Sequence, residues 1–160
     1  MFTKILVPLD GSELAAKILP QVVELAKTQN AQVTLLYVFD AALMENTPAM
    51  VQEAFAAESK RCEMFLGQAA KELGAQGVKA ATACVEGSPA REIIAYAEAK
   101  GMNLIAMATH GKGEVAWVLG SVAEKVVSHA SVPVLLFRVM EVKLPQTKED
   151  FLALLDRGIP

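Results

Sequence analysis

The sequence predicts one α/β domain built on a parallel sheet, and three observations support this fold class. Short apolar runs alternate with longer segments whose apolar residues recur at helical spacing, a pattern typical of repeated strand–helix–strand units. One run, Val33–Phe39, is apolar on both faces, as expected of a parallel strand covered by helices on both sides. The chain has 160 residues, of which 53% are hydrophobic and 21% charged, so it suits a single domain with a sizeable core.

The first half of the chain predicts two strands, each followed by a helix. The aliphatic run Lys4–Leu9 is the first strand and ends at the turn Asp10-Gly11-Ser12. Helical spacing then extends over residues 12–30, and Val33–Phe39 forms the second strand. After a loop, apolar residues three, four or seven positions apart predict a long amphipathic helix over residues 51–74, closed by the glycine at its end.

The third strand and the helix after it are predicted from a change of pattern. Val78–Val85 is more polar and alternates, which favours a strand at the edge of the sheet. Ser88 is the expected N-cap of the next helix, because Pro89 suits the first helical position. That helix continues to Gly101.

The last elements of the core follow the same alternation. Met102–Ala108 is the fourth strand, and Val115–Val127 has helical character with a break at Gly120. Val132–Val139 is the fifth strand, and Pro133 near its start fits a strand beginning or an edge because proline has no N–H for a ladder. We therefore predict a core domain over residues 1–139.

Residues 140–160 are expected to form a C-terminal tail. Thr147 is placed to cap a short helix with Glu149 and Asp150 in its first turn. The apolar residues Phe151, Leu154 and Leu155 would share one face of that helix.

Composition and charge exclude several classes of function. The net charge is −3 and no block of lysine and arginine exists, so nucleic acid is not expected as the main partner. The first apolar run ends at Asp10, too early for a signal peptide, and no run reaches the roughly 18 residues of a membrane span. Cys62 and Cys84 show no CxxC spacing and are expected to be reduced and buried, which favours the cytoplasm.

The stretch Ala108–Ser121 has the residue types of a phosphate loop. Its three glycines allow backbone N–H groups to face inward and let a phosphate approach without an intervening Cβ, and Lys112 adds a cation. Ser121 and Glu124 predict a capping box at the start of the next helix, whose N-terminus offers further N–H donors. A glycine loop before a capped helix, with no ligand, explains these residue types equally well.

At this point the chain resembles the universal stress protein family over residues 2–139, through four segments in matching order and spacing. They are KILVPLDGSE, EGSPAREII, LIAMATHGKG and LGSVAEKVVSHASVPVLL. The resemblance implies an open five-stranded parallel sheet of order 3-2-1-4-5 with helices on both faces, flavodoxin-like or Rossmann-like. It implies homodimers joined through the last strand, Val132 to Val139. In one branch of the family it also implies ATP or another adenine nucleotide, with Mg²⁺, held by G-x2-G-x9-G-[S/T].

Carried over by position, the resemblance assigns roles to individual residues. Asp10 matches the acidic residue that meets the adenosine, and either Val38 or Phe39 matches the apolar position beside adenine. Gly111 and Gly120 match the second and third glycines of the motif. The predicted nucleotide-binding set is Asp10, Val38, Phe39, Ala108, His110, Gly111, Lys112, Gly113, Gly120, Ser121 and Val122.

Two departures from that motif matter. Ala108 stands at the first glycine, which costs about 1–2 kcal/mol if the position is left-handed and less if its backbone is ordinary. Only the residues 112–119 separate Gly111 from Gly120, one fewer than expected. A deletion inside a helix would rotate everything after it by about 100°, whereas a loop can absorb it.

Two functions therefore remain open at the level of sequence. One is a stress-response module that binds an adenine nucleotide with slow or no hydrolysis, and the other is a homodimeric interaction protein that has lost nucleotide binding. Asp10 serves equally well as a helix cap. His110 and His129 lack partners at metal-ligand spacing, and no G-x-S-x-G elbow or complete P-loop exists, so neither a metal site nor a dedicated catalytic site is predicted.

Overall fold

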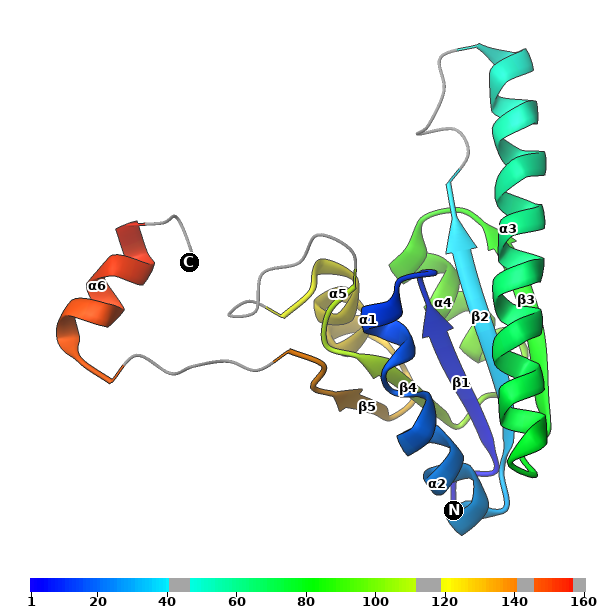
Figure 1. Cartoon of the computed structure of the whole chain (residues 1–160), viewed down its shortest axis with the longest axis horizontal. Coiled ribbons are helices and arrows are strands. Elements are labelled where there is room, and N and C mark those ends of the chain that lie inside the picture. Colours follow the sequence, from blue (N-terminus) through cyan, green and yellow to red (C-terminus); the bar gives the residue numbers. More distant parts are fainter. Residues whose placement is uncertain (41–46, 112–118, 141–145, 157–160) are drawn as a thin grey trace.

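Five parallel strands form one sheet in the order β3-β2-β1-β4-β5 (Figure 1), which confirms the predicted fold class and strand order. The computed structural model describes residues 1–40, 47–111, 119–140 and 146–156. The strands are β1 (Lys4–Leu9), β2 (Gln32–Phe39), β3 (Ala80–Glu86), β4 (Leu104–Ala108) and β5 (Val134–Phe137).

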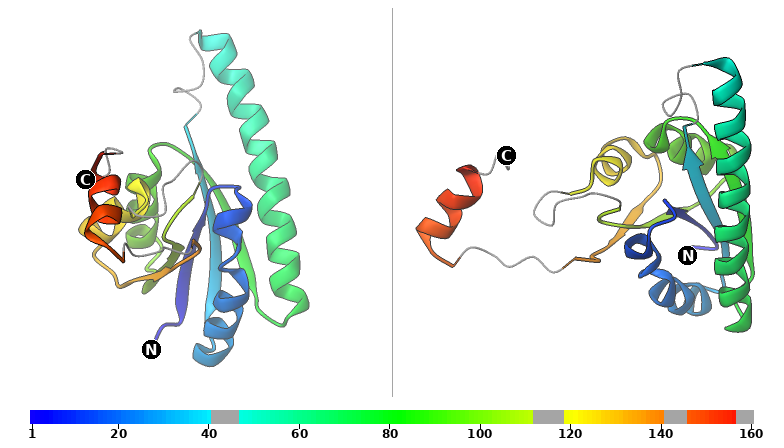
Figure 2. Two further views of the ribbon diagram at one scale, coloured as in Figure 1. Left: turned by 60° about the vertical axis from the view of Figure 1, so that its left-hand side comes forward. Right: turned by 45° about the horizontal axis from the view of Figure 1, so that its top comes forward.

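Helices cover both faces of this sheet (Figure 2). On one face lie α1 (Glu13–Ala16), α2 (Leu19–Gln29) and α3 (Pro48–Ala75); on the other lie α4 (Pro89–Ala99) and α5 (Ser121–His129). Successive strand residues point to opposite faces, so Ile5 and Val7 of β1 pack toward α1–α3 while Leu6 between them packs toward α4 and α5. The sheet is thus buried on both sides, and only its edges and strand ends are open.

Two predicted helices differ in detail from those observed. The helix expected over residues 12–30 is divided into α1 and α2, because Pro20 in the first turn of α2 has no N–H to continue the hydrogen bonding of α1. The long helix α3 does not close at Gly74 but runs to Ala75, and the chain turns at Gly77, whose φ of +81° favours glycine.

The two cysteines correct a prediction. Cys62 on α3 and Cys84 on β3 form a disulfide with Cα atoms 6.1 Å apart, where reduced thiols were expected. A separation of 22 residues matches no local cysteine motif. The two residues meet because α3 packs against β3 in the folded chain.

The structure places the expected short helix in the tail, as α6 (Lys148–Asp156), apart from the sheet in Figure 1. The N–H of Asp150 donates to the Thr147 hydroxyl at 3.1 Å, and the N–H of Thr147 donates to the Asp150 carboxylate at 3.2 Å. This reciprocal cap confirms the predicted helix start.

Candidate functional site

The crevice between β1 and β4 begins where a proline interrupts their pairing. The Lys4 carbonyl accepts from the Asn103 N–H, so the backbone of Lys4 faces β4. Backbone groups alternate in direction along a strand, and Pro8, four residues later, therefore also faces β4. Its nitrogen carries no hydrogen to donate. The two strands pair last at Leu6 and Ile105, whereas β1 stays paired with β2 to its final residue. Their connections also leave toward opposite faces of the sheet, which makes this the topological switch point.

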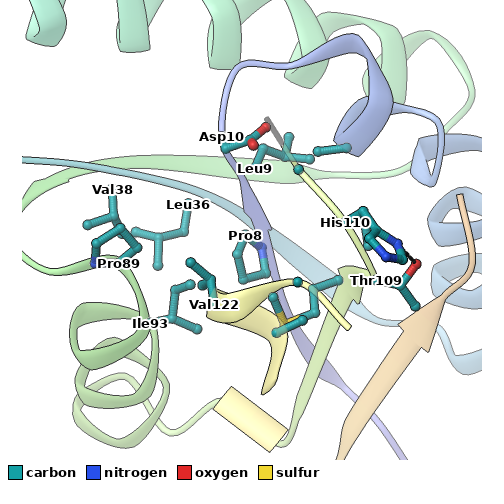
Figure 3. A pocket seen from close by; sticks show the side chains of 16 residues that line it. Pro8, Leu9, Asp10, Leu36, Val38, Pro89, Ile93, Thr109, His110 and Val122 are labelled. Carbon is teal, nitrogen blue, oxygen red and sulfur yellow. Dashed lines mark hydrogen bonds between the residues drawn. The ribbon is translucent and has the colours of Figure 1, made fainter. Parts of the chain in front are cut away.

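A pocket of about 190 Å³ opens at this crevice. Its walls come from the carboxyl ends of three adjacent strands and the first turns of α1, α4 and α5 (Figure 3). The lining residues are Pro8, Leu9, Asp10, Ala15, Leu36, Val38, Pro89, Ile93, Met107, Ala108, Thr109, His110, Gly111, Gly120, Val122 and Ala123. Seven of the predicted site residues are among them: Asp10, Val38, Ala108, His110, Gly111, Gly120 and Val122.

One part of the pocket is wholly apolar. Leu36 and Val38 of β2 face Pro89 and Ile93 of α4 there (Figure 3), a surface suited to the flat face of a base. Phe39 points to the opposite side of the sheet, where its ring lies 5.6 Å from that of Phe55 on α3. Of the two alternatives beside the base, the structure therefore brings Val38 to the pocket and not Phe39.

Asp10 stands at the polar part of the pocket with its carboxylate held in place. Its Oδ1 accepts from the Ser12 N–H at 2.9 Å and from the Ser12 hydroxyl at 2.5 Å. Ser12, and not Asp10, caps α1, because its hydroxyl accepts from the Ala15 N–H at 3.1 Å. Gly111 packs directly against this carboxylate: a Cβ built at Gly111 would lie 3.2 Å from Asp10 Cγ and within contact distance of Oδ2. The carboxylate thus has a fixed orientation beside the glycine loop.

The N-terminus of α5 faces the same pocket without a side-chain cap. The N-cap is Gly120, and Ser121 is the first helical residue, so the predicted capping box of Ser121 and Glu124 is wrong. Because glycine has no side chain to accept from the first-turn N–H groups, those donors and the positive end of the helix dipole remain directed at the pocket, where Val122 and Ala123 lie. Ser121 itself is exposed and does not line the pocket.

The N-terminus of α4 adds to this arrangement. Its N-cap Ser88 makes no side-chain hydrogen bond to the helix, and Pro89 in its first turn lines the pocket. Two helix N-termini therefore converge on one cavity, which favours a negatively charged ligand although the whole chain carries a net charge of −3.

Of the two departures in the glycine loop, the described residues include Ala108, and the one-residue shortening falls mostly outside them. Ala108 is the last residue of β4 and pairs with Phe137, so its backbone is extended and the left-handed cost does not apply. The described residues on either side of that segment are joined, because the Gly120 N–H donates to the Thr109 carbonyl at 2.9 Å. The helix α5 begins beside the pocket, since its N-cap Gly120 lines it.

His110 is buried and its Nδ1 lies 2.8 Å from the Thr109 hydroxyl oxygen. Lys112 and Gly113, also predicted for the site, lie outside the described residues. The lining residues that the sequence did not predict are Pro8, Leu9, Ala15, Leu36, Pro89, Ile93, Met107, Thr109 and Ala123. Pro8 carried a signal, since a proline within a central strand is unusual. Pro89 was predicted as the first helical residue after Ser88 and not as a lining residue, and the remaining apolar residues resemble ordinary core residues, because their exposure to the pocket depends on packing.

Behind the Asp10 turn, Tyr37 links the site to α3. The Tyr37 hydroxyl donates to Glu58 Oε2 at 3.4 Å, and Glu58 Oε1 pairs with Arg61 Nη1 at 2.6 Å. A Cβ at Gly11 would lie 2.8 Å from Tyr37 Cε2, so the ring supports the turn that follows Asp10. Burial raises the pKa of the Tyr37 phenol, and the nearby Glu58 carboxylate raises it further.

Two kinds of feature are absent from the described part of the chain. No group of three His, Cys, Asp or Glu side chains is arranged to hold a metal ion. None of the described helices is long and apolar enough to cross a membrane.

Comparisons with known proteins place these features in a family. The sequence profile of the Universal stress protein family matches residues 1–138. The chain is 36% identical over 148 residues to universal stress protein YxiE of Bacillus subtilis, covering 86% of this chain and 100% of that protein. It is 35% identical over 144 residues to universal stress protein MJ0531 of Methanocaldococcus jannaschii, covering 86% of this chain and 83% of that protein.

Solved structures agree with the sequence comparisons. The structure of protein MJ0577 of Methanocaldococcus jannaschii superposes with a TM-score of 0.81 at 31% identity, covering 89% of this chain and 99% of that one. Universal stress protein UspA of Lactobacillus plantarum gives a TM-score of 0.77 at 28% identity, covering 86% and 98%. A universal stress protein in complex with cAMP shares the fold, with a TM-score of 0.67 at 18% identity, covering 87% and 98%.

Proposed function

The chain belongs to the universal stress protein family, and we propose that it is a cytoplasmic stress-response module that binds ATP or a related adenine nucleotide with little or no turnover. The observation that carries this proposal is the pocket between β1 and β4, which joins an apolar wall to two helix N-termini. A nucleotide presents the complementary chemistry, a flat base at one end and phosphates at the other.

The base would lie between β2 and α4. Leu36 and Val38 form one side of that space and Pro89 and Ile93 the other, with no charged side chain among them. Asp10, held by Ser12, would accept a hydrogen bond from a ribose hydroxyl. One universal stress protein has been crystallised with cAMP, so this fold accommodates an adenine nucleotide in that protein.

The phosphates would lie at the N-terminus of α5. Gly120 leaves the first-turn N–H groups of α5 without a side-chain acceptor, and Gly111 brings backbone close to Asp10 without a Cβ. Any Mg²⁺ ion would enter with the phosphates, because magnesium is commonly held by one or two carboxylates and the phosphates of its substrate.

Little turnover is expected because the pocket offers few groups to activate water. Asp10 and His110 are its titratable side chains among the described lining residues. Asp10 is committed to Ser12, and His110 Nδ1 to the Thr109 hydroxyl. These contacts orient both groups as parts of a binding site.

Thermal unfolding with and without nucleotide tests this function. Saturation at about 100 times the dissociation constant adds about 2.7 kcal/mol, which raises the Tm of a domain of this size by about 5–11 °C. Gly120→Val should abolish the shift, because its side chain would occupy the approach to α5. Gly67→Ala is the matched control, since a Cβ on that helical glycine of α3 meets no atom within 4 Å. No shift for the unaltered chain at millimolar ATP, ADP or AMP would leave the protein as an interaction module without nucleotide.

We also propose a homodimer joined through β5. This edge strand pairs within the described chain only with β4, and its four residues Val134–Phe137 are apolar and only partly buried. Such an edge promotes uncontrolled association unless it is paired, and a second copy across a two-fold axis covers it on both chains.

The backbone direction of β5 gives a sharp test of this dimer. The carbonyls of Pro133 and Phe137 accept from β4, so Leu136 directs its N–H outward from the sheet. Leu136→Pro removes that outward donor without removing a donor to β4, whereas Leu136→Ala keeps it. Sedimentation should show a monomer for the proline variant and a dimer for the alanine variant; a monomer for the unaltered chain would refute the proposal.

A further inference from the structure

The disulfide between Cys62 and Cys84 lies at a boundary within α3. The fully buried residues of this 28-residue helix are Glu58, Cys62, Leu66, Ala69 and Leu73. Its first ten residues pack less deeply, through the partly buried Val51 and Ala54 and the exposed Phe55, whose ring lies 5.6 Å from that of Phe39. In Figure 1 those first turns extend beyond the end of β2. The disulfide therefore fastens α3 close to the point where its fully buried residues give way to the partly buried and exposed residues of its N-terminal part.

The two cysteines differ in exposure. Cys62 on α3 is completely buried, while Cys84 is a partly exposed residue of the edge strand β3, which also carries the exposed residues Ala81 and Thr82. These are the two cysteines of the chain, so no third thiol competes for the pairing. In the cytoplasm, where we place the protein, disulfides are usually transient and redox-sensing.

A short series of contacts connects the disulfide to the pocket. Cys84 is the direct register partner of Tyr37 on β2, and Glu58, which accepts from Tyr37, lies one helical turn before Cys62. The Tyr37 ring in turn packs against Gly11, next to Asp10. A shift of this turn of α3 against β2 and β3 would thus be transmitted through Tyr37 and Gly11 to the polar end of the pocket.

We propose that Cys62–Cys84 is a reversible redox site that fastens the N-terminal part of α3 when oxidised, releases it when reduced, and thereby changes nucleotide affinity. The change in nucleotide affinity rests on the function proposed above, whereas the fastening and release of α3 do not.

The chemistry is thiol–disulfide exchange with a low-molecular-weight thiol. Its thiolate attacks Cys84 Sγ from the exposed edge, the S–S bond breaks, and Cys62 leaves as a thiolate that takes up a proton. A second thiolate attacks the small-molecule sulfur of this mixed disulfide, which forms the small-molecule disulfide and releases Cys84 as a thiolate that takes up a proton. Two thiols are oxidised and two cysteines are reduced, and a low-molecular-weight disulfide reverses both steps.

The test uses the full chain equilibrated in buffers of reduced and oxidised glutathione. Mass spectrometry after alkylation counts free thiols, and hydrogen exchange follows the amides of residues 50–61 against those of residues 67–75. Reduction should expose two thiols reversibly and accelerate exchange over residues 50–61 by about tenfold or more, with little change over residues 67–75. ATP affinity, measured on the same samples, should fall by about fivefold or more on reduction.

The double variant Cys62→Ala with Cys84→Ala is the control, and should exchange like the reduced chain in every buffer. Thiols that stay free under oxidised glutathione would overturn the redox site, and equal exchange over residues 50–61 in both states would overturn the fastening and release of α3. Unequal exchange with equal ATP affinity would overturn its connection to the pocket. Unequal exchange with no ATP binding in either state would support the redox-dependent fastening of α3 and refute the nucleotide function instead.

Discussion

Gly111→Ala tests the contact on which the polar end of the pocket depends. The new Cβ would lie 3.2 Å from Asp10 Cγ and closer still to Oδ2, so either the carboxylate or the loop must move. If the carboxylate moves, it loses two bonds from Ser12, of 2.9 and 2.5 Å, and Ser12 also caps α1. A hydrogen bond to a charged group contributes about 1.5–3 kcal/mol, so the loss of even one of the two should lower the free energy of unfolding by about that amount.

Urea denaturation of the free protein measures this loss, and calorimetric titration with ATP measures binding at a temperature where each variant is folded. We expect at least a tenfold weaker affinity, because both partners of the contact line the pocket. Gly67→Ala provides the matched glycine replacement, and should raise the free energy of unfolding by about 0.5–1 kcal/mol while leaving ATP affinity unchanged. If Gly111→Ala matched the unaltered chain in both measurements, the packing of Gly111 against Asp10 would be refuted.

Two further predictions concern the region behind the pocket. Reducing the disulfide, which joins residues 22 apart, should lower the free energy of unfolding by about 3 kcal/mol on the chain-entropy account, and so lower Tm by about 6–12 °C; an unchanged Tm on reduction would contradict it. Because the folded-state pKa of Tyr37 is raised above its usual value of 10.0, its stabilising contribution should be complete below that pH and lost as pH rises through the higher value. Tyrosinate absorbance should show that Tyr37 titrates at higher pH in the folded than in the unfolded protein, and this rise in pKa should be smaller in Glu58→Gln. A titration of Tyr37 at the same pH in both states would refute the predicted loss of stability.

Much of the fold was predictable because local pattern and global arrangement agree. Val33–Phe39 is apolar on both faces because helices cover both sides of β2, and the alternation of Val78–Val85 marked the edge position of β3. Boundaries were harder to predict. The division of α1 from α2 depended on the hydrogen bond that Pro20 cannot make, and apolar spacing continues across that break.

The site was predictable where residue type alone determines the geometry. Gly111, Gly120 and Asp10, predicted from their places after strands and in the family motif, all line the pocket. The choice between Val38 and Phe39 required the pleat of β2, because adjacent residues on a strand face opposite sides. The partnership of Cys62 with Cys84 required the packing of α3 on β3, which no local pattern shows.

Calorimetric titration of the unaltered chain with ATP, beside Gly120→Val, tests the central claim most directly. We predict saturable binding of one nucleotide per chain to the unaltered protein and none to the variant. Binding of equal strength to both proteins would show that the nucleotide does not lie at the N-terminus of α5. The absence of heat from the unaltered chain at millimolar ATP, ADP and AMP would contradict nucleotide binding itself.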